Sequence, residues 1–156
     1  MAITTAMATS FKSELLQGIH NFHNGSGGGT TTTTGTGNTF KIALYTSSAT
    51  LSASTTAYAS TNEITNTSGT AYSAKGKALT SVTPTLDSST AVCDFADVSW
   101  TSASFTANGC LIFNDSHSTD AAVCAVAFGG DKTVSSGTFT VQFPAAAATT
   151  AIIRIA

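Results

Sequence analysis

The residues of this sequence that could carry out chemistry begin with Asn114-Asp115-Ser116-His117, where a carboxylate, a hydroxyl and an imidazole lie together. A hydrolase needs such groups as a nucleophile, a base and a carboxylate that orients the base. Adjacent residues in a turn rarely align in that way, and no G-x-S-x-G elbow accompanies them. The run 114–117 therefore favours a polar hairpin turn, and a small hydrolase based on His117 is the last of the hypotheses considered.

Carboxylates and histidines form no convincing site elsewhere in the sequence. A glycosidase needs two carboxylates across a cleft, but Asp94 and Asp97 would fall on opposite faces of a strand. His20 and His23 have a helical spacing that could share a metal ion, but no third ligand follows a recognisable pattern. We predict no catalytic residue, no metal site, no cofactor and no enzymatic activity.

Four sulfur-bearing or aromatic positions also deserve an interpretation. Cys93, Cys110 and Cys124 lie in apolar segments without CxxC spacing, which favours buried, reduced thiols over a disulfide or a metal site. Trp100 follows a predicted strand, and its ring could stack on a sugar or anchor an interface. The pattern favours the other interpretation, a partly buried tryptophan at one end of the core.

The composition argues against several classes of protein, those that bind nucleic acid or an anionic membrane and those that span a membrane with a helix. The 156 residues are 42% hydrophobic and only 9% charged, with a formal net charge of −2. Six scattered basic residues do not form the clustered surface that nucleic acid or an anionic membrane requires. The sequence has no apolar run long enough for a spanning helix and shows no secretory signal, so we expect synthesis in a cytoplasm.

The N-terminal residues 1–38 are predicted to form an arm. Its amphipathic helix, expected over 10–23, starts at Ser10 and stops at Gly25, with Gly18 as an unfavourable interior residue. The apolar stripe of that helix supplies the candidate subunit-contact residues Phe11, Leu15, Ile19 and Phe22. The Gly/Thr-rich stretch 25–38 is interpreted as a linker or a long exposed loop.

Residues 39–156 are predicted to form one β domain. A period of two appears first in Phe40–Tyr45, where Phe40, Ile42 and Leu44 face inward. A long loop with one short helical turn is expected over 46–74, and a turn at Gly129-Gly130-Asp131. The other strands are expected at 77–82, 91–98, 104–113, 121–128, 138–143 and 149–155. Six or seven such strands predict an all-β fold, an antiparallel β-sandwich or a jelly-roll-like barrel.

Several short segments, in this order, carry a resemblance that spans nearly the whole chain. They are Thr9-Ser10-Phe11-Lys12, Glu14-Leu15-Leu16 with Gly18, Phe40-Lys41, Ala43-Leu44-Tyr45-Thr46, Thr61-Asn62-Glu63, Gly76-Lys77 with Leu79, Trp100, Gly109 with Leu111-Ile112-Phe113-Asn114, and Phe128-Gly129-Gly130-Asp131-Lys132-Thr133-Val134. The chain thereby resembles small virion structural proteins of tailed bacteriophages. The resemblance implies a capsid decoration or cement protein, with a tail or neck structural protein as the alternative.

The expected partners follow from that resemblance. They are the major capsid protein and copies of the chain itself, a homo-oligomer such as a trimer, with no nucleic acid and no membrane. The expected location is the capsid surface of the virion, after synthesis in the host cytoplasm. A third hypothesis from another class is a carbohydrate-binding adhesion module that uses Trp100 and the tyrosines. The sequence leaves open whether the arm docks on its own domain or on a neighbour.

Overall fold

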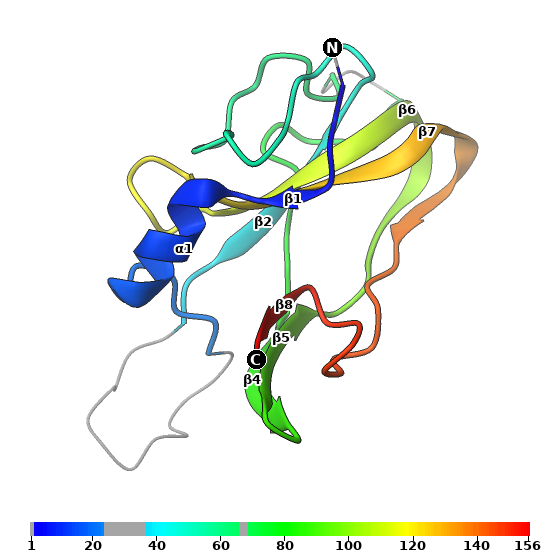
Figure 1. Ribbon diagram of the computed structural model, residues 1–156. Helices are drawn as coiled ribbons and strands as arrows, with labels where there is room; N and C mark the ends of the chain where they lie inside the picture. The colour runs from blue at the N-terminus through cyan, green and yellow to red at the C-terminus, as the bar shows by residue number, and fades with distance from the viewer. Residues whose placement is uncertain (1, 24–36, 66–68) are drawn as a thin grey trace.

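Two antiparallel sheets and one short helix form the fold (Figure 1). The computed structural model describes residues 2–23, 37–65 and 69–156, so most of the predicted linker 25–38 and the predicted helix stop at Gly25 lie outside the described residues. The elements are β1 (Ala6–Met7), α1 (Thr9–Leu16), β2 (Phe40–Tyr45), β3 (Lys77–Ala78), β4 (Ser81–Asp87), β5 (Thr90–Phe95), β6 (Val98–Asn114), β7 (Ala121–Val141) and β8 (Ile153–Ile155). The larger sheet has the order β1-β7-β6-β2-β3 and the smaller one β4-β5-β8. The predicted all-β sandwich with a short N-terminal helix is confirmed.

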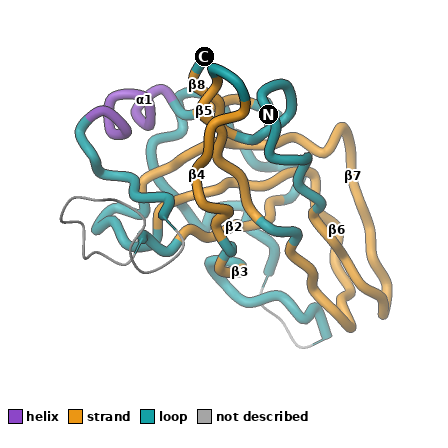
Figure 2. The backbone as a smooth tube through the Cα atoms, turned by 90° about the horizontal axis from the view of Figure 1, so that it is seen from below, coloured by secondary structure: helices purple, strands orange, loops and turns teal. Residues whose placement is uncertain are grey.

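The β6–β7 hairpin is the longest feature of the larger sheet, and Figure 2 shows its strands running side by side. The prediction of a turn at Gly129-Gly130-Asp131 is wrong, because β7 continues through these residues. Residues 128–131 of β7 lie opposite the single residue Asn108 of β6 and form a large bulge. The bulge is possible because Gly129 and Gly130 adopt φ values of 73° and 134°, a region that glycine enters at little cost.

The helix is shorter than its apolar pattern predicts. It spans Thr9–Leu16 rather than 10–23, and its N-cap is Ala8 rather than Ser10. Gly18 ends it, with φ of 73°, and the two bonds of a Schellman motif follow. The amide of Gly18 donates to the carbonyl of Leu15, and the amide of Ile19 to that of Glu14. No helix in the described ranges is long and apolar enough to cross a membrane.

The arm packs onto the core of its own chain. Phe11 and Phe22 are 0% and 6% exposed, whereas Leu15 and Ile19 are half-buried. The ring of Phe22 stacks on that of Phe40, with centroids 4.2 Å apart and planes at 3°. Residues on both sides of the predicted boundary at 38/39 therefore share one hydrophobic cluster.

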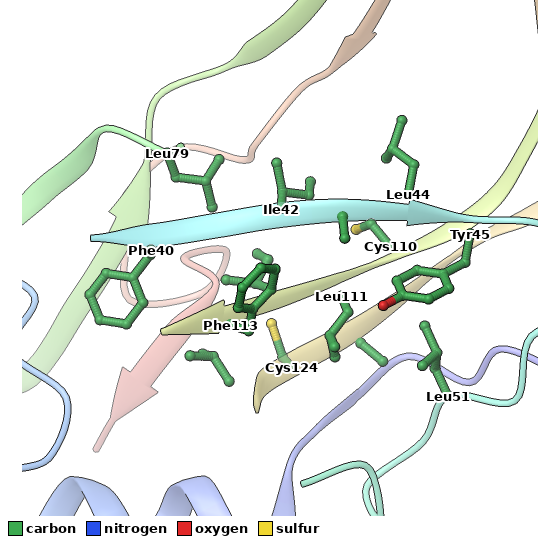
Figure 3. Packing of buried hydrophobic residues seen from close by; sticks show 14 of the residues in the cluster. Phe40, Ile42, Leu44, Tyr45, Leu51, Leu79, Cys110, Leu111, Phe113 and Cys124 are labelled. Carbon is green, nitrogen blue, oxygen red and sulfur yellow. The ribbon is translucent and has the colours of Figure 1, made fainter. Parts of the chain in front are cut away.

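Strand β2 is buried on both faces rather than on one. Figure 3 shows Ile42 and Leu44 on the side of Leu79, and Tyr45 on the side of Leu51. Leu51 belongs to the long loop after β2, which covers the face predicted to be exposed. The described parts of that loop contain turns and isolated bridges, and the helical turn predicted within 46–74 is not among them.

Candidate functional site

The segment 114–117 forms the predicted polar turn between β6 and β7, and its side chains point to separate partners. The hydroxyl of Ser116 accepts a hydrogen bond from the amide of Thr39 at 2.8 Å, whereas the His117 ring bonds Thr119 at 3.0 Å. Neither group contacts the other as a nucleophile and its base would. The structure therefore does not bring the hydrolase candidates together.

Asn114 has a role that the sequence did not reveal. Its side chain is fully buried and ties the arm to the end of β6. The amide Nδ2 lies 3.3 Å from Nδ1 of His20 and 3.3 Å from the carbonyl oxygen of Ile19, while Oδ1 accepts from the Ser116 amide. Nδ2 also lies 3.1 Å from Oδ1 of Asn38, and Nε2 of His20 lies 2.9 Å from a carboxylate oxygen of Glu14. His20 therefore anchors the arm to the end of β6.

The arrangement around His20 does not favour a metal site. Both ring nitrogens of His20 are already engaged, by Glu14 and Asn114. Within the described ranges, no group of three or more His, Cys, Asp or Glu side chains could hold a metal ion.

Glu63 and two tyrosines form another polar cluster of the described chain. The hydroxyls of Tyr58 and Tyr72 donate to the two carboxylate oxygens of Glu63 at 2.5 and 2.8 Å. The Tyr72 hydroxyl also accepts from the buried amide of Leu44 at 2.9 Å. This network fastens the long loop onto β2, a structural task, and its members lie in the segment where the sequence shows no periodicity.

The third tyrosine, Tyr45, donates to the carbonyl of Ala59 at 2.7 Å. Burial raises the pKa of all three tyrosines, and the charge of Glu63 raises each of them further. Ionised tyrosine is therefore strongly disfavoured in the folded protein.

Alkaline pH should unfold the protein cooperatively. Unfolded tyrosine titrates near 10.0. The folded protein holds the pKa of each tyrosine above this value. The stability that the neutral tyrosine contributes is therefore fully present below pH 10.0 and is lost as the pH rises above it. Each such group steepens the loss by about 1.4 kcal/mol per pH unit. In Tyr72→Phe, urea unfolding at several pH values should show lower stability at neutral pH but a shallower alkaline slope. Tyrosine ultraviolet absorbance that titrates near its ordinary pKa before unfolding would contradict this expectation.

Lys75 joins the same region to the β6–β7 turn. Its ammonium lies 3.0 Å from Asp115 and 2.9 Å from Asp120, and Asp115 also pairs with Lys41 at 3.0 Å. Burial raises the pKa of Asp115, but the hydrogen bonds from Lys41 and Lys75 outweigh it and hold the pKa below its usual value. These charges neutralise one another, so the cluster works as a clamp between loops.

The cysteines are buried and unpaired, as predicted. Burial raises the pKa of Cys93 and of Cys124 to about 12, and raises that of Cys110 as well. A nucleophilic or metal-binding cysteine needs its thiolate form, which these values suppress at neutral pH.

Trp100 belongs to the core, as the favoured interpretation predicts, but it is fully rather than partly buried. It is 1% exposed, and its ring lies against those of Tyr72 and Phe139. A sugar-binding platform needs an exposed ring face, so the interpretation of Trp100 as such a platform is wrong.

The remaining candidate is an apolar groove between the arm and the smaller sheet. It encloses about 110 Å³. Its lining is apolar and includes Leu15, Phe22, Pro84, Ala91, Ile153 and Ile155. At this groove β8 adds a third, short strand beside β5. The ring of Phe95 in β5 lies near that of Phe22, which follows α1, with centroids 6.2 Å apart.

Two large aliphatic side chains of these elements are exposed. Ile155, which lines the apolar groove, is 57% exposed, and Leu16, the last residue of α1, is 90% exposed. Exposed apolar surface of this kind is typical of interaction sites. Of the four candidate contact residues, Leu15 and Phe22 reach the groove, Phe11 lies in the core, and Ile19 is half-buried. The arrangement can bind an apolar surface.

Comparison with known proteins adds no relative: the sequence matches no protein-family model, and no curated protein or solved structure matches it.

Proposed function

We propose that this protein is a virion structural protein of a tailed bacteriophage, a capsid decoration or cement protein that binds the outer head shell and stabilises it. The proposal draws on the resemblance of the whole chain to such proteins. The observation that carries it is the apolar groove with Ile155 exposed in its lining, together with the exposed Leu16 at the end of α1, since exposed apolar surface is suited to docking on another protein.

An apolar contact surface is suited to a protein that binds a shell in many copies. A protein present in many copies can hold a lattice through contacts that are weak one by one, because multivalency adds their effects. An apolar contact is also little affected by salt, unlike one between exposed charges. The low charge content of the chain, 9% of residues, suits such a contact.

Electron microscopy of intact virions tests the location. Density of this protein over the outer head lattice is expected, with hundreds of copies per particle in a quantitative mass analysis. Density confined to the tail or neck, with the few copies of a single ring, would replace the proposal by its alternative, a tail or neck structural protein.

Attachment should depend on the apolar groove. Leu16→Asp combined with Ile155→Asp should weaken binding of the purified protein to undecorated heads by at least about 100-fold, because two exposed aliphatic contacts become charged. Both side chains are exposed, so circular dichroism and thermal melting should remain close to those of the parent protein. Co-sedimentation with heads measures the binding.

A matched control adds the same two charges on another surface. Ser135→Asp with Thr138→Asp changes two exposed residues of the distal part of β7. This variant should bind heads like the parent. Equal binding by the folded groove variant and the parent would refute attachment through the groove.

A further inference from the structure

The segment that follows β7 is tied to the smaller sheet through aspartate side chains. Residues 142–156, which we call the strap, run outside regular structure until β8 pairs with β5 (Figure 1). The amide of Phe143 donates to Asp97 at 2.8 Å, and the amide of Ala148 donates to Asp87 at 2.7 Å. Most of the strap is exposed, and a segment of this kind opens locally at a lower free energy than the core does.

A third aspartate, Asp94, lies where the strap meets β5. Cys93 of β5 pairs with Ile153 of β8, so the next residue of β5, Asp94, lies beside Ile152. The amide of Ile152 is close enough to stabilise the ionised carboxyl of Asp94. Asp94 is only 1% exposed, which is rare for an aspartate. The strap therefore closes over a buried carboxyl.

The carboxyl of Asp94 is only half satisfied. Its Oδ1 accepts a hydrogen bond from the amide of Phe95 at 2.8 Å, whereas its Oδ2 is buried and has no hydrogen-bond partner among the described residues. Asp94 also takes part in none of the ion pairs within the described ranges. A buried carboxylate without a cation is costly, and protonation removes that charge.

The ionisable groups around Asp94 do not supply a cation. Its own strand and the residues after it contribute the buried thiol of Cys93 and the carboxyl of Asp97. In β4 the ionisable residue is Asp87, which is also acidic. The strap has one basic residue, Arg154, and its guanidinium donates to backbone carbonyls of the strap itself.

The closed strap binds a proton at Asp94 more tightly than an opened strap would. Burial raises the pKa of Asp94 above its ordinary value of 3.8. The amides of Phe95 and Ile152 lower this pKa and the charge of Asp97 raises it, but burial has the largest effect. Opening of the strap exposes the carboxyl to water and returns its pKa toward 3.8. Closing of the strap and proton binding therefore favour each other.

We propose that Asp94 is a proton-operated latch, with the strap held firmly against β5 when Asp94 is protonated and loosened when its carboxyl is ionised. The strap carries Ile153 and Ile155, which line the apolar groove, so the latch sets how firmly one wall of the groove is held. Its effect on head binding rests on the proposed function. The latch itself is a property of the purified chain.

Hydrogen exchange of the strap tests the latch. The protection of the amides of residues 152–155, corrected for the intrinsic pH dependence of exchange, should rise at least about fivefold between pH 7 and pH 5. One carboxyl can change the opening equilibrium by up to about tenfold per pH unit, which allows a rise of this size. The rise should be absent from the amides of Ile112 and Val123 in the larger sheet.

Uncharged variants show whether Asp94 is the responsible group. Asp94→Asn keeps an acceptor for the amide of Phe95, and both Asp94→Asn and Asp94→Ala should lose the pH response of the strap. The matched control Asp87→Asn keeps an acceptor for the amide of Ala148 and should retain the response. Asp97→Asn should retain it at a lower pH, because its charge no longer raises the pKa of Asp94.

Protection of the strap that stays constant or falls between pH 7 and pH 5 would overturn the latch. So would an equal rise in the larger sheet, or folded Asp94→Asn and Asp94→Ala variants that respond like the parent. A chain whose strap responds to pH but that binds no heads keeps the latch and removes the proposed function. A chain that binds heads without any response of the strap keeps the proposed function and removes the latch.

Discussion

Replacing Phe22 by alanine is expected to lower the free energy of unfolding by about 3–5 kcal/mol and to release the arm from the core. Phe22 lies beyond the C-terminal end of α1, so the change leaves the helix sequence intact. It removes the ring that stacks on Phe40 at 4.2 Å and meets the edge of Phe11 at 6.0 Å. Urea unfolding measures the loss of stability, and hydrogen exchange of the amides of residues 19–23 measures the release.

The control is Leu16→Ala, which truncates a side chain that is 90% exposed. It should change stability by less than about 0.5 kcal/mol. If the arm did not pack into the core of its own chain, Phe22→Ala would change the stability as little as Leu16→Ala does. That result would contradict the shared core.

The alternation of apolar residues locates some strands but not all of their ends: the strand expected at 91–98 is divided between β5 and β6, and of the strand expected at 149–155 only Ile153–Ile155 forms. Phe40–Tyr45 was predicted as a strand and forms β2. The prediction of one exposed face failed because Leu51, which covers that face, lies in a loop without any period. Burial of a strand on its second face depends on such tertiary contacts, which local patterns do not carry.

Glycines were the main source of wrong boundaries. Gly18 was counted as a cost inside a longer helix, whereas its positive φ ends α1. The sequence predicts a turn at Gly129-Gly130-Asp131, although these residues form a bulge within β7. A glycine can lie inside an element, end a helix, form a turn or form a bulge. Which of these occurs depends on the partner strand or carbonyl that its backbone meets.

The polar clusters were missed for a related reason. Asn114 meets His20 across 94 positions of sequence, a distance at which no spacing rule applies. Glu63 lies only 5 and 9 positions from its tyrosine partners, but that loop has no regular geometry from which to predict a contact. The helical stripe marks Phe11 and Leu15 as apolar positions of the arm, and Phe11 lies in the core of its own chain.

Gly76→Ala is expected to destabilise the protein by at least about 3 kcal/mol. Gly76 precedes β3, whose Lys77 pairs with Ile42 of β2, so its backbone approaches that strand closely. It adopts φ of 63°, and an added Cβ would lie 1.8 Å from the carbonyl oxygen of Ile42. Because that neighbour is backbone in a buried strand, relief requires moving β2 itself. Urea unfolding measures the loss.

Gly129→Ala separates the clash from the backbone strain. Gly129 has a similar φ of 73°, but no atom lies within 4 Å of an added Cβ. Its substitution should therefore cost only the strain of a left-handed alanine, about 1–2 kcal/mol. The excess loss in Gly76→Ala then measures how tightly β3 is held against β2. Equal losses in the two variants would contradict the close approach at Gly76, because strain alone would then account for both.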